Sequence, residues 1–196
     1  YQDLGIFESA YWSFQKRLDE VQSVGEEVTG VMLPSFERAI RFDDVTFRHG
    51  DKEIFKRVSL EIPQGSLVAI TGESGAGKTT LVDLISGLIT PQQGSVLVDD
   101  VPLQKLNMLA WRKQIGYVPQ EMFLFHDTVL NNVTLGERSV SRQEAEDALL
   151  KAGAWDFVST LTDGLDTEVG EGGARFSGGQ RQRISLARAL VNRPRL

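Results

Sequence analysis

The sequence predicts an α/β fold that begins with an antiparallel sheet, and three observations support it. Between residues 39 and 63, apolar and polar residues alternate with a period of two, as in half-buried strands. A short apolar run then leads into a glycine-rich loop. After that loop, apolar residues recur with the spacing of a helix. Strands and helices mixed in this order indicate an α/β protein.

Strands are expected wherever short apolar or alternating runs are bounded by turn residues. The first two form a hairpin, with His49–Lys52 as the turn between them. The run SLVAIT suits a buried strand, and GSVLVDDVPL suits two strands joined by a turn. The predicted strands cover residues 39–47, 58–63, 66–71, 94–103 and 115–120.

Three helices are expected in addition to the strands. Leu81, Leu84, Ile85 and Leu88 form the apolar stripe of the first. Ser141 and Glu144 have capping-box spacing at the start of the second, which Gly153 ends. Its buried side is predicted to consist of Ala145, Ala148, Leu149 and Ala152. The third helix runs from about Ser177 to Asn192 and is ended by Pro194.

Residues 1–30 differ from the rest, because their apolar residues step by three and four, which is a heptad stripe on a helix. The stripe consists of Leu4, Phe7, Tyr11, Phe14, Leu18 and Val21. This helix either packs on its own domain or needs an outside partner, and the sequence leaves both open. Gly25–Gly30 is interpreted as a linker.

Composition limits the function classes. The formal net charge is −6, which disfavours a binder of bulk nucleic acid, since such proteins usually carry a basic face. Cysteine is absent, so neither a disulfide framework nor a thiolate metal site is possible within the chain. No apolar run approaches the roughly 20 residues of a membrane helix. Any link to a membrane is therefore expected through other sequence or a partner.

The stretch TGESGAGKTT, residues 71–80, matches the phosphate-loop pattern in full. Glycines at positions 72, 75 and 77 let the backbone wind tightly, so that several N–H groups point at one anion. The start of the following helix adds partial positive charge. Lys78 can reach the β- and γ-phosphates, and the Thr79 hydroxyl can ligate Mg²⁺. This loop predicts a nucleoside triphosphate site, but kinases, GTPases and motors share it.

A second anion site is expected where FSGGQRQR opens the last helix. Ser177 and Gln180 have capping-box spacing. Gly178 and Gly179 each cost about 1 kcal/mol of helix stability relative to alanine, so a ligand close to the backbone would explain them. Two anion sites in one chain suggest a ligand held between two copies.

With these motifs the sequence resembles the ATP-binding-cassette family from about Phe36 to its end. TGESGAGKTT is similar to the Walker A loop, and FSGGQRQR to the signature motif, with Phe where Leu is commoner. YVPQE (117–121) resembles the Q-loop, and TEVGE (167–171) the X-loop of exporters. The resemblance implies a P-loop NTPase-like core with an antiparallel β subdomain and a helical subdomain, preceded by an N-terminal helix.

The resemblance also implies roles for individual residues toward ATP and Mg²⁺. Thr79 and Gln120 would ligate the metal, and Gln120 would also support catalysis by sensing the γ-phosphate. Ser177 and its neighbours would close on ATP bound to the opposing subunit. The expected nucleotide-binding residues are His49, Gly72, Gly75, Ala76, Gly77, Lys78, Thr79, Thr80, Gln120, Ser177, Gly178, Gly179 and Gln180.

Two further positions are assigned by the same resemblance. His49 stands where the family has an aromatic residue that stacks on adenine, and either it stacks there or it is an exposed turn residue. Glu171 would lie near the contact with a membrane domain. His126 has no motif around it and is interpreted as a structural or surface residue.

The resemblance places the Walker B aspartate and the catalytic glutamate on a strand beyond Leu196, so no catalytic carboxylate is expected within this chain. Glu73 and Glu121 are weak substitutes. We therefore expect the chain alone to hydrolyse ATP negligibly, and its parent polypeptide to be an ATPase. Without that strand the sheet would lose a central member beside the phosphate loop.

The leading hypothesis is the motor domain of a membrane exporter at the cytoplasmic face of a bacterial inner membrane. Residues 1–30 would extend from a membrane domain on the same polypeptide, and residues 36–196 would form an incomplete nucleotide-binding domain. Its partners would be that membrane domain and a second nucleotide-binding domain, head to tail, without nucleic acid. The alternatives are a soluble cassette ATPase of DNA repair or translation, a P-loop kinase, and a non-hydrolysing ATP-binding fragment. The cargo and the choice of homodimer or heterodimer stay open.

Overall fold

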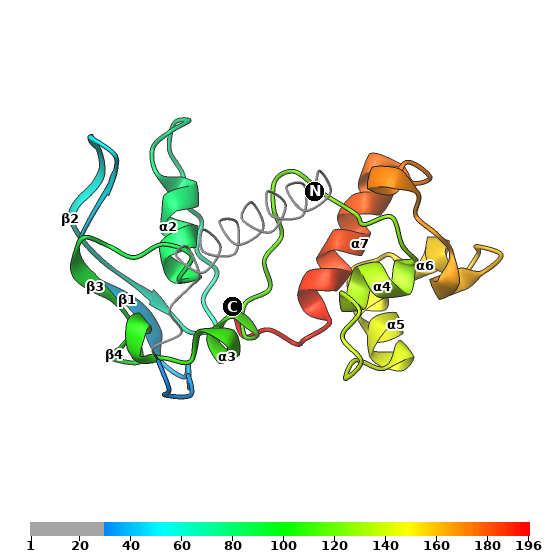
Figure 1. Ribbon diagram of the computed structural model, residues 1–196, viewed down its shortest axis with the longest axis horizontal. Helices are drawn as coiled ribbons and strands as arrows, with labels where there is room; N and C mark the ends of the chain where they lie inside the picture. Colours follow the sequence, from blue (N-terminus) through cyan, green and yellow to red (C-terminus); the bar gives the residue numbers. More distant parts are fainter. Residues whose placement is uncertain (1–29) are drawn as a thin grey trace, which may run out of the picture.

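The structure, a computed structural model, describes residues 30–196 and consists of two lobes (Figure 1). One lobe contains the sheet with helices α2 (Lys78–Ile85) and α3 (Met108–Arg112). The other contains helices α4 to α7. The segment after α3 and the last residues of the chain connect the two lobes (Figure 1). The predicted N-terminal helix lies outside the described residues.

The sheet has four antiparallel strands in the order β2-β1-β3-β4. The strands are β1 (Ala39–His49), β2 (Lys52–Pro63), β3 (Gln93–Val98) and β4 (Val101–Pro102). Asp99 and Asp100 both have positive φ, 49° and 68°, and form the tight turn between β3 and β4. Both predicted hairpins are therefore confirmed, although His49 and Lys52 belong to the strands and only Gly50 and Asp51 form the first turn.

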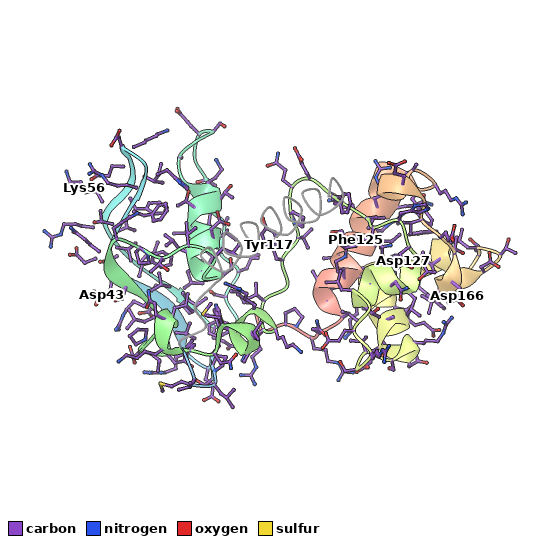
Figure 2. All side chains as sticks on the ribbon, in the orientation of Figure 1. Asp43, Lys56, Tyr117, Phe125, Asp127 and Asp166 are labelled. Carbon is purple, nitrogen blue, oxygen red and sulfur yellow. The ribbon has the colours of Figure 1, made fainter. Side chains whose placement is uncertain are left out.

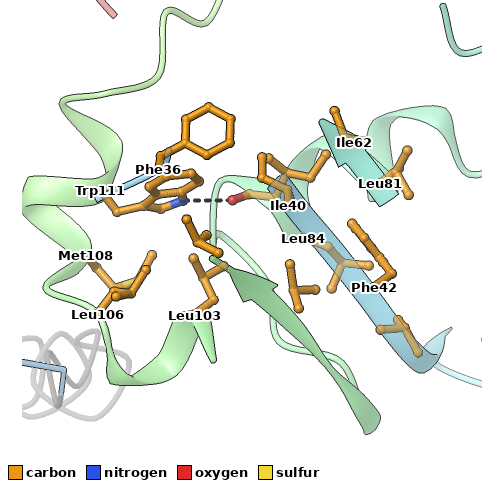
Figure 3. Packing of buried hydrophobic residues seen from close by; sticks show 14 of the residues in the cluster. Phe36, Ile40, Phe42, Ile62, Leu81, Leu84, Leu103, Leu106, Met108 and Trp111 are labelled. Carbon is orange, nitrogen blue, oxygen red and sulfur yellow. Dashed lines mark hydrogen bonds between the residues drawn. The ribbon is translucent and has the colours of Figure 1, made fainter. Parts of the chain in front are cut away.

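The core of the sheet lobe lies between the sheet, α2 and α3 (Figure 3). Leu84 of α2 and Trp111 of α3 are both fully buried in it. The indole N–H of Trp111 donates to the carbonyl of Ile85 over 2.9 Å. Arg112 donates to the carbonyls of Ser86 and Gly87. These donors satisfy carbonyls at the end of α2, which a helix leaves without partners.

The helical lobe packs around a second core. Its helices are α4 (Val129–Thr134), α5 (Arg142–Lys151), α6 (Trp155–Val158) and α7 (Gly178–Leu190). Across the described residues of both lobes, the short 3-10 turns are η1 (Leu103–Lys105), η2 (Gly164–Asp166) and η3 (Glu171–Gly173). Helix α7 packs against α4 and α5. The Ser141 capping box forms as predicted, and the side chains expected on the buried side of α5 are buried. No helix within residues 30–196 is long and apolar enough to cross a membrane.

Two strand predictions are wrong in this structure. Residues 66–71 form no strand, and Leu67 is fully exposed. Residues 115–120 form none either, although Leu196 N–H donates to the carbonyl of Gln114 and Gly116 N–H donates to that of Leu196, as in a parallel strand pair. A strand forms only where a neighbouring strand pairs with its backbone N–H and C=O groups. Apart from these hydrogen bonds with Leu196, the described residues provide no such neighbour for either segment. Leu88 is also 61% exposed, because α2 ends at Ile85.

Candidate functional site

The phosphate loop is shaped by glycines and held against the sheet. Gly77 is the N-cap of α2, with φ 92° and no side-chain cap. A Cβ added at Gly77 would lie 2.7 Å from Ile54 Cγ2 and 3.1 Å from the ring of Phe55 on β2. Only glycine combines this left-handed conformation with so close a neighbour. The sheet therefore fixes where the loop turns into the helix.

Lys78 folds back over its own loop. Its Nζ donates to the carbonyls of Gly72 over 2.9 Å and Glu73 over 2.7 Å. The Glu73 side chain itself is exposed. Thr79 is exposed, while Thr80 is buried. The ammonium group and the Thr79 hydroxyl thus belong to one solvent-facing turn at the start of a helix, an arrangement suited to binding an anion.

The turn before α7 is built by a complete capping box. The N–H of Gln180 donates to Ser177 Oγ over 3.3 Å, and the N–H of Ser177 donates to Gln180 Oε1 over 2.8 Å. Gly178 and Gly179 are exposed, and a Cβ at Gly179 would meet no atom within 4 Å. Crowding inside the described chain therefore does not explain a glycine here, whereas an approaching ligand would.

His49 lies at the end of the sheet that carries the phosphate loop. Its exposed ring packs edge-on against Phe47, with ring centroids 5.0 Å apart. Phe47 pairs in register with Phe55, the residue whose ring lies against Gly77. This position is compatible with adenine stacking, which stays a prediction.

Gln120 is exposed. It belongs to the segment after α3 that connects the lobes, and this segment runs apart from the start of α2 (Figure 1). Tyr117, on the same connection, is also half exposed (Figure 2). The start of α7 is likewise far from the loop, on the other lobe (Figure 1). The physical reason is the same as for the two missing strands. Residues 66–71 and residues 115–120 form no strands, so no sheet within the described residues joins the phosphate loop to the segment that carries Gln120.

The region after Gln120 contains contacts that sequence reasoning missed. The N–H of Val129 donates to the carbonyl of Thr167, and the N–H of Val169 donates to that of Asp127, both over 2.9 Å. These bonds join the segment after Gln120 to TEVGE. Hydrogen bonds from the Asn131 side chain and the Thr128 N–H lower the pKa of Asp127. No local pattern could reveal a pairing across about 40 residues.

A hollow of about 530 Å³ opens beside this pairing. It is lined by Phe125, His126, Asp127, Asn131, Leu135 and Gly136. Phe123 and Phe125 are 59% and 49% exposed, and their rings meet edge to face. His126 is exposed, in agreement with its interpretation as a surface residue, and so are Glu121 and Glu171.

The donor set fits a nucleotide-bound Mg²⁺ better than a metal held by protein alone. Within residues 30–196, no group of three His, Cys, Asp or Glu side chains could hold a metal ion. Thr79 and Gln120 offer exposed oxygen donors, the kind that Mg²⁺ prefers. Mg²⁺ usually keeps several waters and takes its remaining ligands from phosphates, so few protein oxygens suffice.

Comparisons with known proteins agree on one family. A family model described as ABC transporter matches residues 55–196. The chain is 41% identical over 174 residues to the ATP-dependent lipid A-core flippase of Desulfotalea psychrophila, covering 89% of this chain and 30% of that protein. Over 160 residues it is 43% identical to the protein of the same name from Francisella tularensis subsp. holarctica, covering 81% of this chain and 26% of the relative.

A solved structure gives the same result. A bacterial Atm1-family ABC exporter with ATP bound superposes with a TM-score of 0.83 at 36% identity. The match covers 92% of this chain and 32% of the exporter chain. The chain thus spans about a third or less of the length of each of these relatives.

Proposed function

Because the chain belongs to the ABC transporter family, we propose that it is the ATP-binding motor domain of an exporter. In this role, ATP binding closes a dimer of two such domains and hydrolysis reopens it. At each step, an attached membrane domain switches the side of the membrane to which its cargo site is open. The exporter match and the TEVGE motif support export over a soluble role in DNA repair or translation.

One observation carries the proposal: the glycine-rich turns that begin helices α2 and α7 lie on different lobes of one chain. The turn at Lys78 and the turn at Ser177 both present helix N-termini to solvent, and they lie far apart (Figure 1). One phosphate group cannot contact both turns of the same described chain. A second copy placed head to tail would bring the Ser177 turn of one subunit to the Lys78 turn of the other.

The residues of the site have distinct tasks in this dimer. Lys78 and the amides of residues 75–80 would hold the phosphates, and Thr79 and Gln120 would hold Mg²⁺ once the segment that carries Gln120 reaches the loop. The metal supplies charge stabilisation for the phosphoryl group when it is bound. Ser177, Gly178 and Gly179 donate to the γ-phosphate from the opposing subunit. Positioning and charge stabilisation account for most of the catalysis of phosphoryl transfer.

The membrane domain is proposed to contact the helical lobe. The exposed rings of Phe123 and Phe125 and the adjacent hollow belong to the segment that pairs with the TEVGE motif. Aromatic residues of this kind are enriched at protein interfaces. The names of two relatives make a lipid the first cargo to test, at the cytoplasmic face of a bacterial inner membrane.

The test is ATP hydrolysis by the full-length polypeptide that carries this chain. Lys78→Ala should lower kcat about 10²-fold or more, since removing one phosphate donor costs about that much. Lys113→Ala, which removes an exposed ion pair with Glu137, is the matched control and should leave hydrolysis unchanged. Full activity in Lys78→Ala would overturn the proposal. Stimulation by nucleic acid rather than by lipid would favour the soluble alternative.

A further inference from the structure

The segment that follows Gln120 is held by a buried amide. Asn132 of α4 is fully buried, and its Oδ1 accepts the N–H of Phe125 over 2.8 Å. Its Nδ2 donates to the carbonyls of Phe125 and Thr128, both over 3.0 Å. The side chain therefore bonds both backbone groups of Phe125, as a neighbouring strand would.

Arg188 of α7 completes this arrangement from the other side. Its Nε donates to the carbonyl of Asn132 over 2.7 Å, and its Nη2 donates to Asn132 Oδ1 over 2.9 Å. Its Nη1 donates to the carbonyl of Phe123 over 2.9 Å. The guanidinium carbon lies 5.4 Å from the centroid of the Phe125 ring. Three oxygen acceptors surround one planar guanidinium group, and a lysine ammonium group could not bond all three in this geometry.

The position of Arg188 on α7 gives these bonds a mechanical consequence. The helix that carries Arg188 begins at the Ser177 turn. Ser177 and Arg188 are eleven positions apart, which spans roughly 16 Å at 1.5 Å per residue. A continuous helix of this length moves as a rigid element. A displacement of residues 123–125 would therefore reach the Ser177 turn along one continuous helix, and a displacement of the turn would reach residues 123–125.

We propose that Arg188, through Asn132, is a positioning residue that couples the segment after Gln120 to the Ser177 turn. This inference rests on the proposed function, because the turn must close on ATP of the opposing subunit. We call the hydrogen bonds that Arg188 and Asn132 make with residues 123–125 the clamp. Without the clamp, the Ser177 turn is no longer held in position for closure, while each subunit still binds ATP through Lys78 on the other lobe. A purely structural role for Arg188 would lower stability without separating the two kinetic constants.

The kinetic test uses Arg188→Gln and Arg188→Lys in the full-length protein. Both should lower kcat about tenfold, as expected for lost hydrogen bonds of a charged group, and change KM for ATP by less than about twofold. The control is Arg142→Gln, which removes another two-bond arginine fork in the same lobe, to Asp166. It should leave kcat unchanged. An equal effect of the control, or a KM that rises with the loss of kcat, would overturn the coupling.

Hydrogen exchange in the unaltered protein tests the clamp even if the variants do not fold. The amide of Phe125 should exchange as slowly as the amides of α7, within about tenfold, because both open in one event. Exchange of Phe125 more than about tenfold faster would show that the segment moves independently, and would overturn the proposal. An unaltered protein that does not bind ATP would instead contradict the proposed function and leave the exchange result standing.

Discussion

The turns that begin helices α2 and α7 are stabilised by different means. The phosphate loop begins α2 without a side-chain cap, and its shape depends on Gly77 lying against Ile54 and Phe55 of the sheet. The turn before α7 is held by hydrogen bonds between Ser177 and Gln180, the two ends of one four-residue segment. The first turn therefore depends on tertiary packing, and the second forms from its own sequence. Substitutions should affect the two turns differently.

The largest difference is expected from alanine at the two turn glycines. Gly77→Ala should destabilise the protein by about 2 kcal/mol or more, because it combines left-handed strain with a clash against Ile54. Gly179→Ala lies in an open helical position and should raise stability by about 0.5–1 kcal/mol. Thermal unfolding of the full-length protein measures both.

The rate of ATP hydrolysis by Gly179→Ala tests whether a ligand approaches this glycine. Despite its added stability, Gly179→Ala should lower ATP hydrolysis, because the new methyl group occupies the approach to the turn. A Gly179→Ala protein that is more stable and fully active would show that no ligand comes close to this backbone.

A smaller effect separates the two serine caps. Ser177→Ala and Ser141→Ala each remove the N-cap of a complete capping box, and each should cost about 1 kcal/mol of stability. Only Ser177→Ala should also reduce ATP hydrolysis, since Ser141 caps a helix with no proposed ligand. Paired melting curves and rate measurements test this. Equal hydrolysis in the two variants would restrict Ser177 to capping.

The smallest expected effect is a difference between the Ser141 and Ser177 capping boxes in how their stability depends on pH. Hydrogen bonds from the Ser141 N–H and hydroxyl lower the pKa of Glu144, whereas Gln180 does not titrate. A lowered pKa in the folded state stabilises the fold above the unfolded value, about 4.3, and this contribution is lost as pH falls through the folded value. Thermal unfolding from pH 7 to 3 should show a smaller acid loss in Glu144→Gln than in the unaltered protein. Identical slopes would contradict the assignment.

Local features of the fold were predictable, and features that need a distant partner were not. The capping boxes at Ser141 and Ser177 and the alternation of β1 are each contained within one segment. Residues 66–71 have the composition of a strand, but a strand forms only where a neighbour takes up its backbone groups. Sequence reasoning therefore gave the antiparallel hairpins correctly, and was wrong about the strands at residues 66–71 and 115–120.

The same distinction holds within the candidate site. Gly77, Lys78 and Ser177 were found from motifs because their turns are continuous in sequence. Arg188 was missed, since it acts on Asn132, 56 residues away. An arginine on a helix gives no local sign of such a partner. The buried Asn132 was the one available signal, because a polar residue among apolar helix positions usually bonds to backbone.

The central claim is that each ATP lies between the Lys78 turn of one subunit and the Ser177 turn of another. The most direct test measures ATP hydrolysis by mixed dimers of the full-length protein, purified through two different tags. A dimer with Lys78→Ala in one subunit and Ser177→Ala in the other keeps one intact composite site. A dimer with both substitutions in one subunit keeps none. We predict hydrolysis in the first dimer and little in the second; the reverse result would place the whole site within one chain and contradict the account.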